Sequence, residues 1–115
     1  MAADITITPI TAGMTDEWRD FVADLKGSRR IEWAQSQRRR GITREVVSIA
    51  SGSPDLAAIY TESSDHAAAA QLLNNSMDPF DEWYREQLSR LLATPLDVAV
   101  VFDSAPQPGL WKGWR

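Results

Sequence analysis

Four short runs rich in β-branched residues alternate with two longer stretches of helical periodicity, and this order constrains the fold more than any other feature. The runs cover residues 5–10, 44–50, 56–62 and 97–103, and the helical stretches cover residues 15–40 and 66–92. A turn rich in serine, glycine and proline, residues 51–55, joins the second run to the third and predicts an antiparallel hairpin. The sequence therefore predicts an α+β domain in which each helical stretch connects two strands.

Both helical stretches carry apolar side chains at helical spacing, and each is interrupted once. The first begins at Thr15, a common N-cap residue, is weakened or kinked at Gly27 and ends at Gly41. The second breaks at residues 74–76 and restarts at residues 78–79, where an N-cap aspartate precedes a proline. We therefore expect two bent or divided helices.

This element order is the β-α-β-β-α-β plan of ferredoxin-like folds, which predicts a four-stranded antiparallel sheet with the helices on one face. The third and fourth runs are apolar on both sides, and such strands are usually covered on both faces. Since the helices cover one face, we expect a second subunit to cover the other in a twofold dimer. The predicted domain spans residues 1–104, and a tail containing proline and tryptophan spans residues 105–115.

The element order, the two-faced strands and the segment Asp78–Leu88 resemble the dimeric α/β-barrel superfamily, and within it small uncharacterised proteins of the DUF6176 type. Those proteins have a tryptophan-bearing first helix, then a stretch rich in arginine and glutamate, then a hairpin. The resemblance covers residues 5–103. It implies a homodimer packed through its sheet faces, with a pocket between the sheet and the helices of each subunit. The superfamily includes cofactor-independent monooxygenases, isomerases and haem proteins, so the resemblance implies no single reaction and carries over no catalytic motif.

The composition narrows the class of partner. A net charge of −4 argues against nucleic-acid binding, although six of the twelve basic residues lie between Arg29 and Arg44. This basic stretch is interpreted as a solvated face, with an anion site or an ion-paired dimer edge as alternatives. The absence of cysteine excludes a disulfide framework, a zinc ribbon and a cysteine nucleophile. No basic signal-peptide start and no bilayer-spanning apolar run is visible, so we expect a cytoplasmic protein without membrane contact.

Six side chains are candidates for lining a ligand pocket: Arg29, Glu32, Trp33, Tyr60, Trp83 and Gln87. Arg29 and Glu32 fall where the apolar stripe of the first helical stretch turns polar, and Gln87 interrupts the stripe of the second. The aromatic side chains would wall the pocket around a flat ligand. In the competing interpretation the aromatic residues are core, the charged pair lies on the surface and Gln87 is half-exposed.

His66 is the only histidine and stands at a predicted helix start. It is a candidate general base or haem ligand, but an exposed first-turn residue is the simpler interpretation because no partner stands at metal-ligand spacing. We expect no metal and no tightly bound cofactor. Two hypotheses remain. The first is a homodimer that binds or transforms a small apolar or aromatic molecule, and the second is a non-catalytic homodimeric interaction module.

Overall fold

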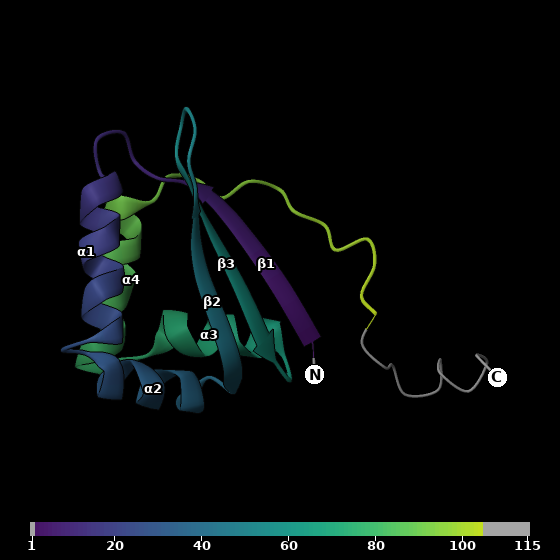
Figure 1. The fold of residues 1–115 in the computed structure, drawn as a ribbon. Coiled ribbons are helices and arrows are strands. Elements are labelled where there is room, and N and C mark those ends of the chain that lie inside the picture. The colour runs from purple at the N-terminus through teal and green to yellow at the C-terminus, as the bar shows by residue number, and fades with distance from the viewer. Residues whose placement is uncertain (1, 105–115) are drawn as a thin grey trace.

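The computed structural model describes residues 2–104, which form one sheet with helices on one side (Figure 1). The strands are β1 (Ala2–Pro9), β2 (Ile42–Ala50) and β3 (Leu56–Ser63), and the helices are α1 (Thr15–Lys26), α2 (Arg30–Arg39), α3 (His66–Asn75) and α4 (Pro79–Leu91). The sheet is antiparallel in the order β1-β3-β2, so β3 is central. α1 and α4 stand side by side, and α2 and α3 lie at the end of the sheet where β1 begins.

The strand register divides the side chains between two faces of the sheet. Ile59 of β3 pairs with Thr6 of β1 and Val47 of β2, and these side chains point towards the helices, on what we call the inner face. The next row along the strands contains Ile5, Tyr60 and Val46, which point the opposite way because side chains alternate along a strand. We call this the outer face, and none of the helices of residues 2–104 covers it.

The core is built mainly by α1 and α4. Its fully buried helical side chains recur at helical spacing and are Trp18, Phe21 and Leu25 on α1 with Phe80, Tyr84 and Leu91 on α4. The ring centroid of Phe21 lies 5.7 Å from that of Tyr84 and 5.5 Å from that of Trp83. Tilted aromatic contacts of this kind stabilise a helix pair beyond the burial of its area. The pair packs on Ala57 at the centre of the sheet.

The first helical stretch is divided where the sequence predicts a break. α1 ends at Lys26, and the backbone N–H groups of Gly27 and Arg29 both donate to the carbonyl oxygen of Asp24, at 3.2 and 2.8 Å. α2 then ends before Gly41, whose φ of 72° is the left-handed conformation that glycine adopts without steric cost. This break turns α2 across the end of the sheet, so that Ser36 rather than an apolar residue is its buried side chain.

Residues 97–103 do not form the predicted fourth strand, and the expected four-stranded, ferredoxin-like sheet of a dimeric α/β-barrel is wrong for this chain. The sheet has three strands, although the α+β character holds. After α4, the N–H groups of Ala93 and Leu96 donate to the carbonyl oxygens of Pro9 and Ile7, at 2.9 and 2.8 Å. The chain then turns away from β1 (Figure 1). Branched residues favour extended backbone, but a strand also needs backbone partners.

The predicted tail of residues 105–115, with Trp111 and Trp114, lies outside the described part of the chain. Within residues 2–104, no helix combines the length and the apolar character that a membrane span needs.

Candidate functional site

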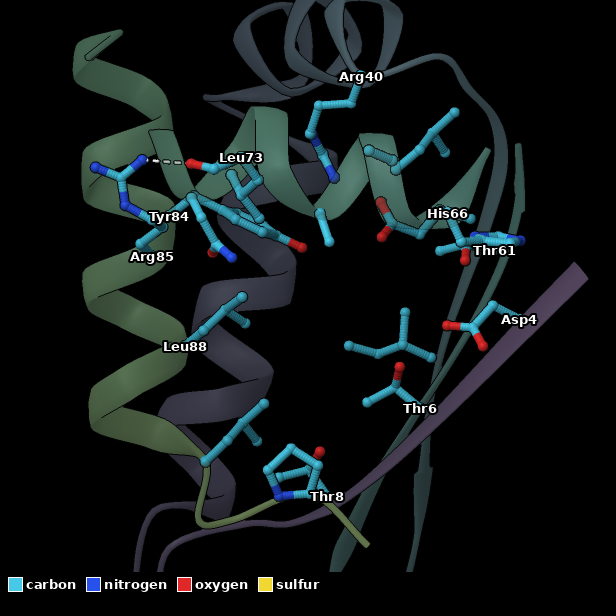
Figure 2. Close-up of a pocket in the computed structure, with 18 of the residues that line it drawn as sticks. Asp4, Thr6, Thr8, Arg40, Thr61, His66, Leu73, Tyr84, Arg85 and Leu88 are labelled. Atoms are coloured by element: carbon cyan, nitrogen blue, oxygen red, sulfur yellow. Dashed lines mark hydrogen bonds between the residues drawn. The ribbon is translucent and has the colours of Figure 1, made fainter. Parts of the chain in front are cut away.

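A cavity of about 810 Å³ lies between the inner face of the sheet and the helices α3 and α4 (Figure 2). Its volume falls within the range of small-molecule sites in proteins. The sheet contributes Thr6 and Thr61, and the helices contribute His66, Leu73 and Leu88.

The cavity has an apolar side and a polar side. Leu73 of α3 and Leu88 of α4 form apolar wall opposite β1, as Figure 2 shows. On β1, Asp4, Thr6 and Thr8 occupy alternate positions and therefore all point inward. A mostly apolar pocket with a few convergent polar groups is the usual form of a ligand site.

Arg40 is the group at this site whose hydrogen-bonding capacity is not met. It follows α2 directly, is 7% exposed and points into the cavity in Figure 2. Its Nε donates to Ser36 Oγ at 3.2 Å, but its buried Nη2 has no hydrogen-bond partner among residues 2–104. A guanidinium carries five N–H donors, and leaving a buried donor unpaired costs about 1–3 kcal/mol. An acceptor oxygen on a ligand would recover that cost.

Tyr84 and Glu45 lie on the same wall as Arg40. The guanidinium carbon of Arg40 lies 5.7 Å from the centre of the Tyr84 ring. Burial raises the pKa of Tyr84 above its usual value and the Glu45 carboxylate adds to the rise, while Arg40 opposes it. The phenol therefore stays protonated at neutral pH and can donate. Glu45 accepts a 3.0 Å hydrogen bond from Gln37 Nε2.

Arg85 also lines the cavity, but its charge is used within the fold. Its Nη1 donates to the carbonyl oxygens of Leu73 and Ser76, at 2.5 and 2.8 Å. These carbonyls stand at the end of α3, where the helix leaves acceptors unpaired. Arg85 therefore pairs with carbonyl groups at the end of α3, whereas Nη2 of Arg40 has no acceptor among residues 2–104.

A buried carboxylate, Asp81, positions the Arg40 end of α2. Its Oδ1 accepts from Ser36 Oγ at 2.5 Å, and its Oδ2 accepts from Ser76 Oγ at 2.6 Å and from Arg39 Nη2 at 3.0 Å. We call these four residues the Asp81 cluster. Because Ser36 also accepts from Arg40, the cluster links α4 to the guanidinium at the cavity.

The Asp81 carboxylate stays ionised although its side chain is only 2% exposed. Burial favours the neutral form, but the hydrogen bonds from Ser36, Ser76 and Arg39 outweigh it and lower the pKa of Asp81 below 3.8. The sequence did not predict the Asp81 cluster. The position of Asp81 in the sequence could have indicated that it is buried, because Asp81 directly follows the core residue Phe80 and precedes Tyr84 by three positions.

The six residues predicted to line the pocket lie elsewhere. Arg29, Glu32, Trp83 and Gln87 gather on the surface of the helices: the guanidinium carbon of Arg29 lies 3.9 Å from the Trp83 ring centroid. Arg29 also pairs with Glu32 at 3.5 Å, and the Gln87 side-chain oxygen accepts from Arg90 at 2.7 Å. These contacts match the surface-pair interpretation.

Tyr60 and Trp33 complete that set. Tyr60 lies on the outer face of the sheet, and Trp33 is half-buried against the core. None of the six residues lines the cavity beside Arg40. Their role in ligand binding stays a prediction, and the structure directs attention to Arg40, Tyr84 and Thr6 instead.

His66 starts α3 as predicted, but it is half-buried and both ring nitrogens have neighbours. Nε2 lies 3.0 Å from the carbonyl oxygen of Ala2, and Nδ1 lies 3.0 Å from Ser63 Oγ. A carbonyl only accepts, so Nε2 carries the proton and the Ser63 hydroxyl donates to Nδ1 in the neutral ring. The histidine thus joins α3 to β1 and β3 at one end of the cavity.

The comparisons with known proteins leave the function to be argued from this geometry. No family model, no curated protein and no solved structure matches the chain.

Proposed function

We propose that the protein binds a small molecule in the cavity between the inner face of the sheet and helices α3 and α4. The observation that carries the proposal is the unpaired, buried Nη2 of Arg40 beside a cavity of about 810 Å³. A protein that only needed a stable fold would gain by filling this space with apolar side chains. The proposal concerns binding and assigns no chemical step.

The lining specifies a class of ligand. Leu73 and Leu88 suit an apolar or aromatic body, and Arg40 with Tyr84 suits an oxygen that accepts hydrogen bonds. Glu45 offsets part of the arginine charge, so a carbonyl oxygen fits the site as well as a carboxylate does. We therefore propose a small, mostly apolar molecule that carries a carbonyl or carboxylate group, bound without a tightly held cofactor.

A panel of matched probes tests this proposal. Benzoate, phenylacetate and octanoate, each with its primary amide, are titrated into the protein and followed by NMR chemical shifts and calorimetry. We expect Arg40→Met to weaken binding of the best probe at least tenfold, because the ligand oxygen loses its donor. Arg38→Met, at an exposed position in the last turn of α2, just before Arg40, is the matched control and should bind as the unchanged protein does.

Leu88→Trp provides a second variant that keeps the arginine and fills the cavity. It should weaken acids and amides alike. Failure of every probe to bind, or equal loss in the Arg40 and Arg38 variants, would contradict the proposal. Circular dichroism confirms that each variant is folded before its affinity is interpreted.

A second proposal concerns the outer face of the sheet. Ile5 and Val46 are 39% and 38% exposed there, and none of the helices α1 to α4 lies over them. Apolar side chains gathered on one face mark an interaction surface. We propose that two chains form a homodimer through this face, which is compatible with ligand binding on the inner face. A cytoplasmic location, which the absence of cysteine favours, belongs to the same proposal.

A further inference from the structure

Three polar side chains on the sheet side of the cavity are left without partners by the fold. They are Asp4 and Thr6 of β1 and Thr61 of β3, and Figure 2 shows the Asp4 carboxylate turned towards the cavity. Within the described part of the chain, none of the three side chains forms a hydrogen bond or an ion pair. A half-buried carboxylate without a partner is costly, so this side of the cavity lacks a donor.

The strand register brings these three side chains together. Asp4 lies directly opposite Thr61 on the neighbouring strand, and the Cβ atoms of such a pair are about 5 Å apart. Thr6 is two residues further along β1 and therefore on the same face, at a rise of about 7 Å. A single group bound over this part of the sheet can therefore contact one carboxylate and two hydroxyl oxygens.

This set of oxygen atoms suits a primary amine. An ammonium group has three N–H donors and no acceptor, and the carboxylate and the two hydroxyl groups offer three acceptors. The carboxylate also supplies the opposite charge, which strengthens the hydrogen bond. A divalent metal ion fits the set less well, because residues 2–104 contain no group of three histidine, cysteine, aspartate or glutamate side chains placed to hold one.

The basic side chains that line the cavity do not pair with Asp4. Arg85 donates to carbonyl oxygens at the end of α3, and His66 uses both ring nitrogens within the fold. Arg40 directly precedes β2, whereas Asp4 belongs to β1, and β3 lies between these two strands. Two strand spacings amount to roughly 10 Å, so one ligand can meet both Asp4 and Arg40 only if a body of some length separates its polar groups.

We propose that the ligand carries an amino group, held by Asp4, Thr6 and Thr61, in addition to the oxygen that pairs with Arg40. The inference rests on the binding function proposed above and narrows its ligand to ω-amino acids and their amides, in which an apolar chain or ring separates the two polar ends. The buried Arg40, 7% exposed and with Nη2 unpaired among residues 2–104, is the independent sign of a ligand in the same cavity. The cavity thus offers an acceptor set and a donor, and such a ligand satisfies both.

Probes that differ only by an amino group test this inference. Benzoate is compared with 4-(aminomethyl)benzoate, and octanoate with 8-aminooctanoate, by calorimetry at pH 7. We expect at least one amino probe to bind the unchanged protein at least tenfold more tightly than its parent acid. Asp4→Asn keeps the shape of the side chain but removes its charge, and it should reduce this affinity ratio to about one.

The matched control is Asp20→Asn, which removes the same charge from an exposed site on α1 and should keep the full ratio. Thermal unfolding verifies that both variants are folded. Parent acids that bind through Arg40 without any gain from the amine would overturn the inference and leave the proposed function standing. A gain that persists in the Asp4 variant would overturn it in the same way, whereas failure of every probe, with or without an amine, removes both.

Discussion

The polar and apolar side chains of β1 lie on the opposite faces of the sheet from those that they usually occupy. The inner face, towards the helices, receives Asp4, Thr6 and Thr8, whereas the uncovered outer face receives Ile5 and Ile7. A strand at the surface of an isolated domain normally turns its apolar side chains to the helices and its polar ones to water. The inversion is understandable if the inner face borders a ligand and a second copy covers the outer face.

This arrangement has an energetic cost on each face of the sheet. A polar side chain such as Thr8, which is buried, is costly unless it finds a hydrogen-bond partner. On the outer face, each Å² of apolar surface left in water forgoes about 25 cal/mol. Both faces of the sheet are therefore incompletely satisfied within residues 2–104. The inner face lacks an acceptor for Arg40, and the outer face lacks a cover for Ile5.

The largest expected effect comes from breaking the outer face. Val46→Glu puts a carboxylate in the middle of the proposed dimer interface, once from each copy. Since burying an unpaired charge is costly, we expect the dissociation constant of the dimer to rise at least a hundredfold, or about 3 kcal/mol. Sedimentation equilibrium over a range of concentrations measures this change.

Ser51→Glu, in the exposed turn after β2, adds the same charge outside the face and should leave the dissociation constant unchanged. The outer-face proposal is wrong if the Val46 variant dimerises as well as the control does. Because Val46 is partly exposed in the single chain, the variant should stay folded, which thermal unfolding verifies.

The sequence predicted most elements because their signals are local. Helical spacing at Trp18 and Phe80, the break at Gly27 and the turn after Ala50 depend on neighbours in the chain, and the structure has each of them. The fourth strand failed because pairing depends on a distant edge. The pattern of residues 97–103 indicates extended backbone but does not say whether an edge of the sheet lies in position to pair with it.

The candidate site was harder to predict for a related reason. Arg40 follows two other arginines, and nothing in the sequence separates a buried guanidinium from an exposed one. Whether an arginine is buried depends on tertiary contacts. One of these is the hydrogen bond between Ser36 and Asp81, which lie 45 positions apart in the sequence. Arg29 was predicted to line a pocket because of its place in a polar stripe; the structure pairs it with Glu32 on the surface, and its role in binding stays a prediction.

A smaller effect is expected at the Asp81 cluster, which supports the inner face. Asp81→Asn removes the charge from a carboxylate that accepts three hydrogen bonds, and its amide group adds a donor where donors already converge. We expect the free energy of unfolding at pH 7 to fall by about 2 kcal/mol. Urea unfolding measures it, and Asp20→Asn, exposed on α1, is the control that should change it little.

The pH dependence sharpens this prediction. The pKa of Asp81 is lower in the folded protein than its ordinary 3.8, so the carboxylate stabilises the fold above that pH. This contribution declines as the pH falls through the folded pKa. The stability difference between the unchanged protein and Asp81→Asn should therefore be full at pH 7 and shrink below pH 4. A difference that stays constant down to pH 2 would contradict the role of the charge.

The smallest effect is expected at Arg29, which lies on neither face of the sheet. Arg29→Ala removes the contact with the Trp83 ring and a 3.5 Å ion pair with Glu32, both on the helix surface. Exposed contacts of these kinds contribute about 0.5–1 kcal/mol each, and we expect a loss of about 1 kcal/mol in urea unfolding with no change in probe affinity. Arg30→Ala, exposed on the same helix without that ring contact, is the control. A tenfold loss of probe affinity in the Arg29 variant alone would move the binding site from the inner face to the helix surface, because the cavity beside Arg40 does not include Arg29.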